Sequence, residues 1–361
     1  MKVMENEILQ SITLDWLSLY CHGSIHDSEG FVFLKLPYST RHFASIFEIY
    51  YKMKKIGTAT AHPSSPILHP QSVVVKFENE LLYSRSARYF IQKFLIATKL
   101  KYVSISRADI ARDFHRFLGN LKPMDLITSF FSGKYLKNGR GTFNTYGEQR
   151  NKTVYDYLRF GSKSTGRTIY LYNKTKEMAE VKEKNYIKAF WEKNGLNTGA
   201  EVWRIEFSFK GSGTKILDLI TGLISKIHWH DLFKIDKLTE LLNAAIGQYF
   251  NFKVNDGSKN KTRMEDLKLF ANSDVGIKLA SIPDQSDPIT PIKIMLKNMV
   301  KEYNKLKPEQ KKESFSLHYS ITAIASQYSL IGYLNKTVQF VFSTPENPFL
   351  PPIPSFQTKL F

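Results

Sequence analysis

Short runs of β-branched and aromatic residues, separated by Gly, Pro and Ser, fill most of the first 210 residues of the chain. Such runs predict β-strands with turns between them. Helical spacing of apolar residues predicts one helix over 85–100, and a second, charged helix is expected from Thr175. The predicted strands are 11–20, 31–37, 43–51, 56–61, 73–77, 102–114, 154–160, 168–172 and 201–210. The pattern predicts the α+β class, with an antiparallel β-sheet flanked by helices.

The character of the chain changes after about residue 214. Residues 215–225, 231–250, 291–306 and 316–334 are predicted helices, with Gly and Pro concentrated between them. The last segment, 343–361, holds five prolines and is predicted to be an extended tail. We therefore expect three parts. These are an α+β domain over 1–214, a mostly helical domain over 215–342 that binds DNA or a partner, and the tail.

The distribution of charge indicates a polyanionic partner. The formal net charge is +18, and residues 115–175 alone carry eleven Lys and Arg against three acids. This segment also holds many Gly, Ser, Asn and Tyr residues, a composition that suits contact with a strand of nucleic acid. A solvated basic face is the plainer interpretation. The candidates for DNA contact from this segment are Lys134, Arg140, Arg159 and Arg167.

Other features narrow the class of protein. A single cysteine, Cys21, excludes an intrachain disulfide framework and a cysteine-based zinc site. The first residues lack a basic stretch followed by an apolar run, so no signal peptide is expected. Residues 314–335 are free of Asp, Glu, Lys and Arg, but they contain His, Gln, Ser and Tyr. We expect no membrane partner and a cytoplasmic location.

Three predicted strands each carry a polar face. Alternation places Arg107, Asp109 and Asp113 on one face of the first, and Arg204, Glu206 and Ser208 on one face of the second. Thr168, Tyr170, Tyr172 and Lys174 share a face of the third. If the strands lie in one sheet, carboxylates, tyrosines and cations meet there. Carboxylates suit Mg²⁺ or Mn²⁺, and a tyrosine beside such an ion can attack a phosphodiester. Ordinary cross-strand ion pairs are the structural alternative.

These strands resemble a known family, the rolling-circle replication initiators called Rep_trans, together with related relaxases of conjugative elements. The resemblance runs from about residue 11 to 215 and covers five ordered pieces. They are Asp15-Trp16-Leu17, the run 106–113, the run 160–164, Tyr170-Leu171-Tyr172-Asn173-Lys174, and Trp203-Arg204-Ile205-Glu206-Phe207. No family resemblance extends past residue 215.

The resemblance implies an enzyme that nicks one DNA strand at an origin, stays attached to the 5′ phosphate through tyrosine, and thereby starts rolling-circle replication. It implies Tyr172 as nucleophile with Lys174 assisting, and Asp109 and Glu206 as ligands of Mg²⁺ or Mn²⁺, with Asp113 as a weaker candidate. Tyr170 is the second candidate nucleophile, because Leu171 stands where the family often has a basic residue. Arg107 and Arg204 would hold phosphates, and Gly161, Ser162 and Lys163 would form a turn against the DNA backbone.

A histidine motif offers a competing metal site. His228-Trp229-His230 matches the histidine–hydrophobic–histidine pattern of another group of rolling-circle endonucleases. Here it lies between predicted helices, and the Tyr51 to Lys54 motif precedes it, the reverse of that group's order. A helix N-terminal turn with Asp231 is the interpretation that we favour.

The expected partner is origin DNA, single-stranded or in a hairpin at the nick, in a bacterial host. A host helicase and a second copy of the chain are candidate partners. The alternative function is a non-catalytic DNA-binding or nucleic-acid packaging protein of a mobile element such as a plasmid or phage.

Overall fold

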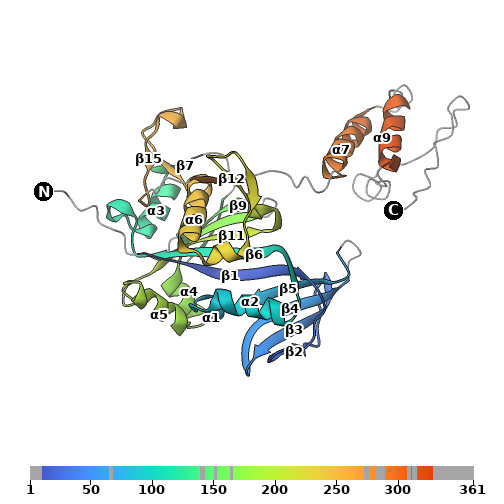
Figure 1. Ribbon diagram of the computed structural model, residues 1–361. Helices are drawn as coiled ribbons and strands as arrows, with labels where there is room; N and C mark the ends of the chain where they lie inside the picture. The colour runs from blue at the N-terminus through green and yellow to red at the C-terminus, as the bar shows by residue number, and fades with distance from the viewer. Residues whose placement is uncertain are drawn as a thin grey trace, which may run out of the picture. The chain divides into compact units, whose positions relative to one another are not determined.

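The computed structural model describes residues 10–64, 68–138, 143–149, 153–162, 166–271, 276–280, 289–306, 310 and 315–327. Ten antiparallel strands form its main sheet, in the order β2-β3-β4-β5-β1-β6-β11-β10-β9-β8 (Figure 1). Their bounds are β1 Gln10–His22, β2 Phe31–Lys35, β3 Phe43–Tyr51, β4 Lys54–Pro63, β5 Ser72–Phe77, β6 Lys101–Phe114, β8 Phe143–Gln149, β9 Thr153–Ser162, β10 Arg167–Asn173 and β11 Trp203–Lys210. The predicted α+β class and antiparallel sheet are confirmed.

The two longest strands, β1 and β6, pair with each other over most of their length and form the middle of the sheet. A bulge between Leu14 and Trp16 shifts the register of β1, so that Asp15 is the extra residue. β6 pairs on its other side with β11, and β11 with β10. The three strands with predicted polar faces are therefore consecutive neighbours.

Helices cover the two faces of this central region differently. α6 (Ile235–Tyr249) buries Leu238, Leu241 and Leu242 in the main core, on the side of the sheet that carries the apolar residues. α4 (Lys174–Glu180) and α5 (Asn185–Lys193) lie on the opposite side of β1 and β11 in Figure 1. They form a smaller apolar cluster around Trp191. The polar face is thus covered only in part.

The remaining elements complete the sheet's surroundings. α1 (Asn79–Leu82) and α2 (Ala87–Ala97) follow β5, and α3 (Pro123–Phe131) follows β6. Two small sheets, β13-β12-β16 and β15-β14-β7, are formed by short strands. These strands are β7 Tyr135–Lys137, β12 Lys215–Asp218, β13 Ile224–Lys226, β14 Phe252–Val254, β15 Asp266–Leu267 and β16 Ile277–Leu279, and the 3₁₀ turns are η1 Leu118–Asn120, η2 Gly211–Thr214, η3 Trp229–Phe233 and η4 Lys261–Arg263.

The helix predicted over 215–225 is wrong, since this segment forms the β12–β13 hairpin. The carboxylate Oδ1 of Asp218 accepts hydrogen bonds from the backbone N–H groups of Ile220 and Thr221, at 2.9 and 2.8 Å. Gly222 follows with a φ of +69°. An Asx turn followed by a left-handed glycine reverses the chain where a helix would have to continue.

The chain divides into two compact units, Met1–Ile282 and Pro283–Phe361. The sequence pattern predicts a first boundary after residue 214, whereas α6 packs on β1 and β10 within the first unit. In the second unit, α7 (Ile289–Lys305) and α9 (Phe315–Gln327) pack through Leu296, Val300, Ile321 and Ala325. The tail 343–361 lies outside the described residues. A DNA- or partner-binding role for 215–342 stays a prediction.

Candidate active site

Strand register assembles the candidate site. Tyr170 and Tyr172 of β10 lie opposite Glu206 and Arg204 of β11. On the other side of β11, Arg204 lies opposite Asp113 of β6, and Ser208 opposite Asp109. Directly opposite residues on antiparallel strands project from the same face of a sheet. The three polar faces predicted from alternation therefore form one continuous surface.

Tyr172 and Glu206 are joined directly. The hydroxyl of Tyr172 donates a hydrogen bond of 2.8 Å to Oε2 of Glu206. Burial and the Glu206 charge raise the pKa of Tyr172 well above its usual range. Burial, with the neighbouring Asp109 carboxylate, raises the pKa of Glu206 to about 7. A carboxylate that half-titrates near neutral pH is suited to accept a proton from the hydroxyl it contacts.

Asp109 is the second carboxylate of the site. Its Oδ1 accepts a hydrogen bond of 2.9 Å from Nε of Arg107, and its Oδ2 pairs with Nη2 of the same guanidinium. Burial raises the pKa of Asp109, although Arg107 opposes the shift. The guanidinium also lies 4.3 Å from the ring centroid of Trp16. Arg107 is thus fixed at the border of the site while remaining partly exposed.

Lys174 is buried at the start of α4. The side chain of Asn173 caps this helix by accepting a hydrogen bond from the N–H of Lys176. Nζ of Lys174 lies 5.6 Å from the Tyr172 ring centroid and pairs with Glu177 at 2.6 Å. Burial, followed by the charge of Arg204, lowers the pKa of Lys174. Lys174 is thus a buried cation beside Tyr172, and its role in favouring the phenolate stays a prediction.

Arg204 and Asp113 have structural partners. Nε and Nη2 of Arg204 donate to the two carboxylate oxygens of Asp113 at 2.6 and 2.8 Å, and neither side chain is exposed. Asp113 also accepts from Nε1 of Trp191 at 2.6 Å. On its far side, Arg204 pairs with Asp15 at 2.8 Å. Because these contacts occupy both groups, we leave Arg204 out of the phosphate contacts and Asp113 out of the metal ligands.

The same network contains residues that the sequence patterns do not single out for a role. Tyr83, the C-cap residue of α1, donates a hydrogen bond of 2.6 Å to Asp15 and accepts one of 3.1 Å from Arg204. Asp15 lies in a motif matched to the family, which is the one signal that could have found it. Tyr83 and Trp191 carry no such signal, because they reach the network from helices far away in sequence.

A pocket of about 500 Å³ opens above the two tyrosines. We call it the tyrosine pocket, and its lining includes Tyr170, Tyr172, Glu206 and Arg107. Asp156, Lys176, Glu177 and Glu180 also line it. Tyr170 accepts a hydrogen bond of 3.0 Å from the hydroxyl of Thr168 rather than contacting a carboxylate. Tyr172 is therefore the tyrosine of the two whose hydroxyl meets a proton-accepting group.

The residues predicted to contact DNA differ in their exposure to solvent. Arg167 is 2% exposed and donates to the backbone oxygens of Lys215 and Ala280, so its role is structural. Arg159 is half-buried, 5.7 Å from the Tyr170 ring centroid, and Lys134 is exposed. Gly161 lies near the end of β9 with a φ of +100°. Lys163, Arg140 and the side chain of Ser162 lie outside what the structure describes.

The histidine motif forms a turn, which is the interpretation favoured from its sequence context. His228 is the N-cap of η3, and its ring accepts a hydrogen bond of 3.3 Å from the N–H of His230. The two rings stack with centroids 4.8 Å apart. Within the described parts of the chain, no three His, Cys, Asp or Glu side chains group as metal ligands would.

Asp109 and Glu206 are nevertheless a chemically suitable pair for a divalent cation. Burial raises the pKa of both carboxylates, and the charge of Asp109 raises that of Glu206 further. A cation beside them would offset both effects. Mg²⁺ commonly uses one or two carboxylates and takes its other ligands from water and substrate phosphates. The residues present therefore fit a Mg²⁺ or Mn²⁺ ion that is completed by the substrate.

Comparisons with known proteins find a structural likeness. No protein-family model and no curated protein match this sequence. Among solved structures, a rolling circle replication initiator protein from Geobacillus stearothermophilus is similar with a TM-score of 0.40. It is 14% identical, and the match covers 72% of this chain and 93% of that one. No helix in the described ranges is long and apolar enough to cross a membrane.

Proposed function

We propose that this protein is a DNA nicking and joining enzyme that cuts one strand at an origin through a 5′-phosphotyrosine intermediate and so initiates rolling-circle replication. The observation that carries the proposal is the hydrogen bond from Tyr172 to Glu206 at the wall of an open pocket. A neutral tyrosine is a weak nucleophile, and an adjacent base is what activates it. The motif resemblance across the same strands supports the same residue.

The reaction that we propose begins with proton transfer. Oε2 of Glu206 accepts the proton of Tyr172, and the phenolate oxygen attacks the phosphorus of the scissile phosphodiester. The bond from phosphorus to the 3′ oxygen breaks, the 3′ oxygen takes up a proton from solvent, and the 5′ phosphate remains esterified to Tyr172. Because one phosphodiester replaces another, the later attack of a 3′ hydroxyl can reseal the strand without ATP.

The surrounding cations assist this step. Lys174 lies beside the Tyr172 ring and favours its phenolate. Arg107, at the edge of the pocket, can offset charge on a phosphate. Asp109 and Glu206 would hold Mg²⁺ or Mn²⁺, which when bound supplies further neutralisation at the phosphate. Origin DNA in single-stranded or hairpin form, a host helicase, a second copy of the chain and a cytoplasmic location belong to this proposal.

Mass spectrometry of a covalent peptide–DNA adduct tests the proposal directly. The protein is incubated with supercoiled or single-stranded DNA and Mg²⁺ or Mn²⁺, digested, and searched for a phosphodinucleotide on each tyrosine. An adduct on Tyr172 is expected. An adduct on Tyr170 would move the nucleophile by two residues. If no nick and no adduct form on any DNA with either metal, the protein is a DNA-binding protein without this activity.

A further inference from the structure

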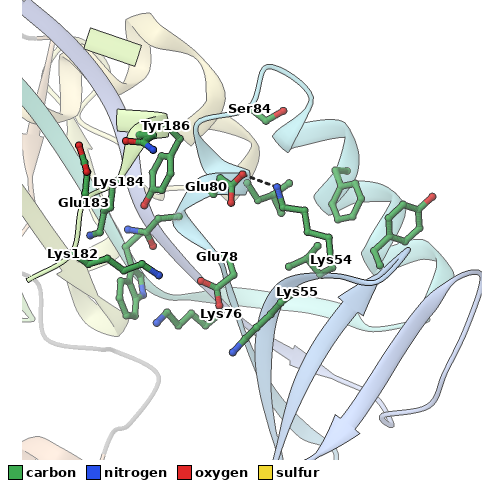
Figure 2. Close-up of a pocket in the computed structure, with 17 residues that line it drawn as sticks. Lys54, Lys55, Lys76, Glu78, Glu80, Ser84, Lys182, Glu183, Lys184 and Tyr186 are labelled. Carbon is green, nitrogen blue, oxygen red and sulfur yellow. Dashed lines mark hydrogen bonds and ion pairs between the residues drawn. The ribbon is translucent and has the colours of Figure 1, made fainter. Parts of the chain in front are cut away.

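A second, larger pocket lies next to the tyrosine pocket. Its volume is about 970 Å³, and Figure 2 shows it between the strand ends that carry Lys54, Lys55 and Lys76 and the segment with Lys182 and Lys184. We call it the lysine pocket. Its volume is at the upper end of the range of about 300–1,000 Å³ that is usual for ligand pockets.

Trp16 and Arg107 separate the two pockets. Trp16 lines the lysine pocket, and Arg107 lines the tyrosine pocket. The Arg107 guanidinium lies 4.3 Å from the Trp16 ring centroid, and Nζ of Lys76 lies 3.7 Å from the same centroid. A chain of phosphates that leaves the tyrosine pocket past Arg107 would therefore enter the lysine pocket.

Lysines outnumber glutamates in the lining of the lysine pocket, and the same holds for those that have no ion pair. Five lysines and three glutamates line it. Lys54 is paired with Glu80 at 2.6 Å, Lys55 with Glu48 at 2.5 Å, and Glu183 with Lys188. Within the described part of the chain, Lys76, Lys182 and Lys184 have no ion pair, against Glu78 alone among the acids.

Lys76 is the most constrained of the three. Burial lowers its pKa, and the charges of Arg107 and Lys55 lower it further, whereas Glu78 raises it. An anion placed against Lys76 would offset this unfavourable environment. Lys182 is exposed on the connection between α4 and α5, where it can turn toward a bound phosphate.

Aromatic rings stand among these cations. Trp16, Tyr51, Phe90 and Tyr186 line the same pocket. Cations next to aromatic rings are the combination that binds single-stranded nucleic acid, because phosphates meet the cations while bases pack on the rings. A duplex keeps its bases stacked inside, so it cannot use both parts of such a pocket.

We propose that the lysine pocket binds an unpaired nucleotide of the DNA strand that runs on from the phosphate held at Tyr172. Lys76, Lys182 and Lys184 contact its phosphates, and the rings of Tyr51, Phe90 and Tyr186 receive its base, since cations already cover the Trp16 ring. This inference rests on the proposed function for its substrate, DNA, and adds where the strand leaves the site and in which form.

The test measures binding of a fluorescent oligothymidylate of about eight nucleotides, a length within the usual range for single-strand sites. The protein is Tyr172→Phe, so that binding is read without nicking. Adding Lys182→Gln and Lys184→Gln removes two proposed phosphate contacts, one from an exposed and one from a half-buried lysine between α4 and α5. The expected result is several-fold weaker binding, with the log–log salt slope smaller by about 1.4, since each single-strand contact contributes about 0.7. Lys76→Gln should weaken binding as well.

The control removes the same number of charges elsewhere, from the exposed lysines of Lys226→Gln and Lys278→Gln on the small sheet β13-β12-β16. Binding should change little there, and a duplex of the same sequence should compete poorly. The proposal is overturned if the two double variants weaken binding equally or if the Lys182 and Lys184 changes have no effect. It is also overturned if duplex DNA competes as well as the single strand. The binding assay tests only the lysine pocket, because Tyr172→Phe does not nick. The nicking assay tests the proposed function, so failure of one proposal can be told from failure of the other.

Discussion

Oε2 of Glu206 accepts the hydroxyl hydrogen of Tyr172 at 2.8 Å, across the pairing of β10 with β11. The residue directly opposite Glu206 on β10 is Tyr170, so the bond runs diagonally to the next residue on the same face. Diagonal neighbours on one face lie about 7–8 Å apart at their Cα atoms, which long side chains can bridge. Of the two tyrosines on this face, Tyr172 is therefore the one that contacts the Glu206 carboxylate.

Tyr172→Phe should abolish nicking and the covalent adduct while DNA binding survives. The change removes one oxygen from a packed ring and leaves the Lys174 and Arg204 environment in place. Gel analysis of supercoiled DNA with added Mg²⁺ gives the measurement. Tyr170→Phe is the matched control, because it removes a hydroxyl from the same strand and face, and it should retain most activity. The assignment of Tyr172 is wrong if the two variants behave in the opposite way.

Glu206→Gln should lower the nicking rate and change its pH dependence. In the wild type the rate should rise with pH, because Glu206 must be ionised to accept the tyrosine proton. The pKa of Glu206 is about 7 without metal, and a bound cation lowers it, so the midpoint should fall at or below 7. Glutamine keeps a hydrogen-bond acceptor for Tyr172 but cannot take the proton. Single-turnover nicking rates across a pH range measure this rise. If the nicking rate of Glu206→Gln rises with pH in the same way, another group acts as the base.

The same substitution has a second readout, in stability. The pKa of Glu206 is raised in the folded state from 4.5 to about 7, so the folded protein binds this proton more tightly than the unfolded chain does. The contribution of Glu206 to the free energy of unfolding is therefore fully present at acid pH and is lost as pH rises from about 4.5 to 7. Urea denaturation of wild type and Glu206→Gln across this range should show the difference between them changing steadily in that direction.

Removal of divalent metal should stop nicking, and Mg²⁺ or Mn²⁺ should restore it. Asp109→Asn should raise the metal concentration needed for half-maximal activity, because the carboxylate pair then offers one anionic ligand fewer. Calorimetric titration of Mn²⁺ into the protein–oligonucleotide complex gives a readout that does not depend on turnover. Full activity in excess chelator would remove the metal from the mechanism and leave Glu206 with the role of base alone.

The sheet and its polar face were predictable because alternation is a local property. Hydrophobic alternation in 203–209 and 105–114 placed Glu206 and Asp109 each on the polar face of its own strand. Only the pairing of β11 with β6 shows that the two faces coincide. The partner of each charge could not be predicted in this way. Asp113 and Arg204 lie on the same strand faces as the site residues, so alternation alone cannot tell them apart. Their buried partners, Trp191 and Tyr83, come from helices far away in the sequence. The 215–225 hairpin was missed because its helical apolar spacing outweighed the Asx turn at Asp218.

The buried pair of Arg204 and Asp113 should matter for stability more than for catalysis. Asp113→Asn leaves Arg204 without one of its two carboxylate partners in a site with no solvent exposure, so the free energy of unfolding should fall by about 3–5 kcal/mol. The control is Asp231→Asn, which breaks the exposed pair with Lys234 and should cost under about 1 kcal/mol. Urea denaturation measures both. Equal losses would show that the buried network is not a main source of stability.

A substitution at Gly161 tests whether the end of β9 positions β10, the strand that carries Tyr172. Its φ is +100°, and a Cβ there would lie 2.4 Å from the backbone oxygen of Arg167, at the start of β10. Gly161→Ala should therefore force these two strands apart and lower both the free energy of unfolding and the nicking rate. Gly133→Ala is the matched control. It has a similarly positive φ of +78° but nothing within 4 Å of the added carbon.

The control isolates the backbone strain, about 1–2 kcal/mol for an L-residue with positive φ. Gly161→Ala should exceed that value, because the clash is with backbone that no side-chain rotation relieves. Since Tyr172 lies five residues beyond Arg167 on the same strand, a displaced β10 should also lengthen the contact between Tyr172 and Glu206 and slow nicking in Gly161→Ala alone. Equal stability and activity in the two alanine variants would show that this close approach does not position the tyrosine.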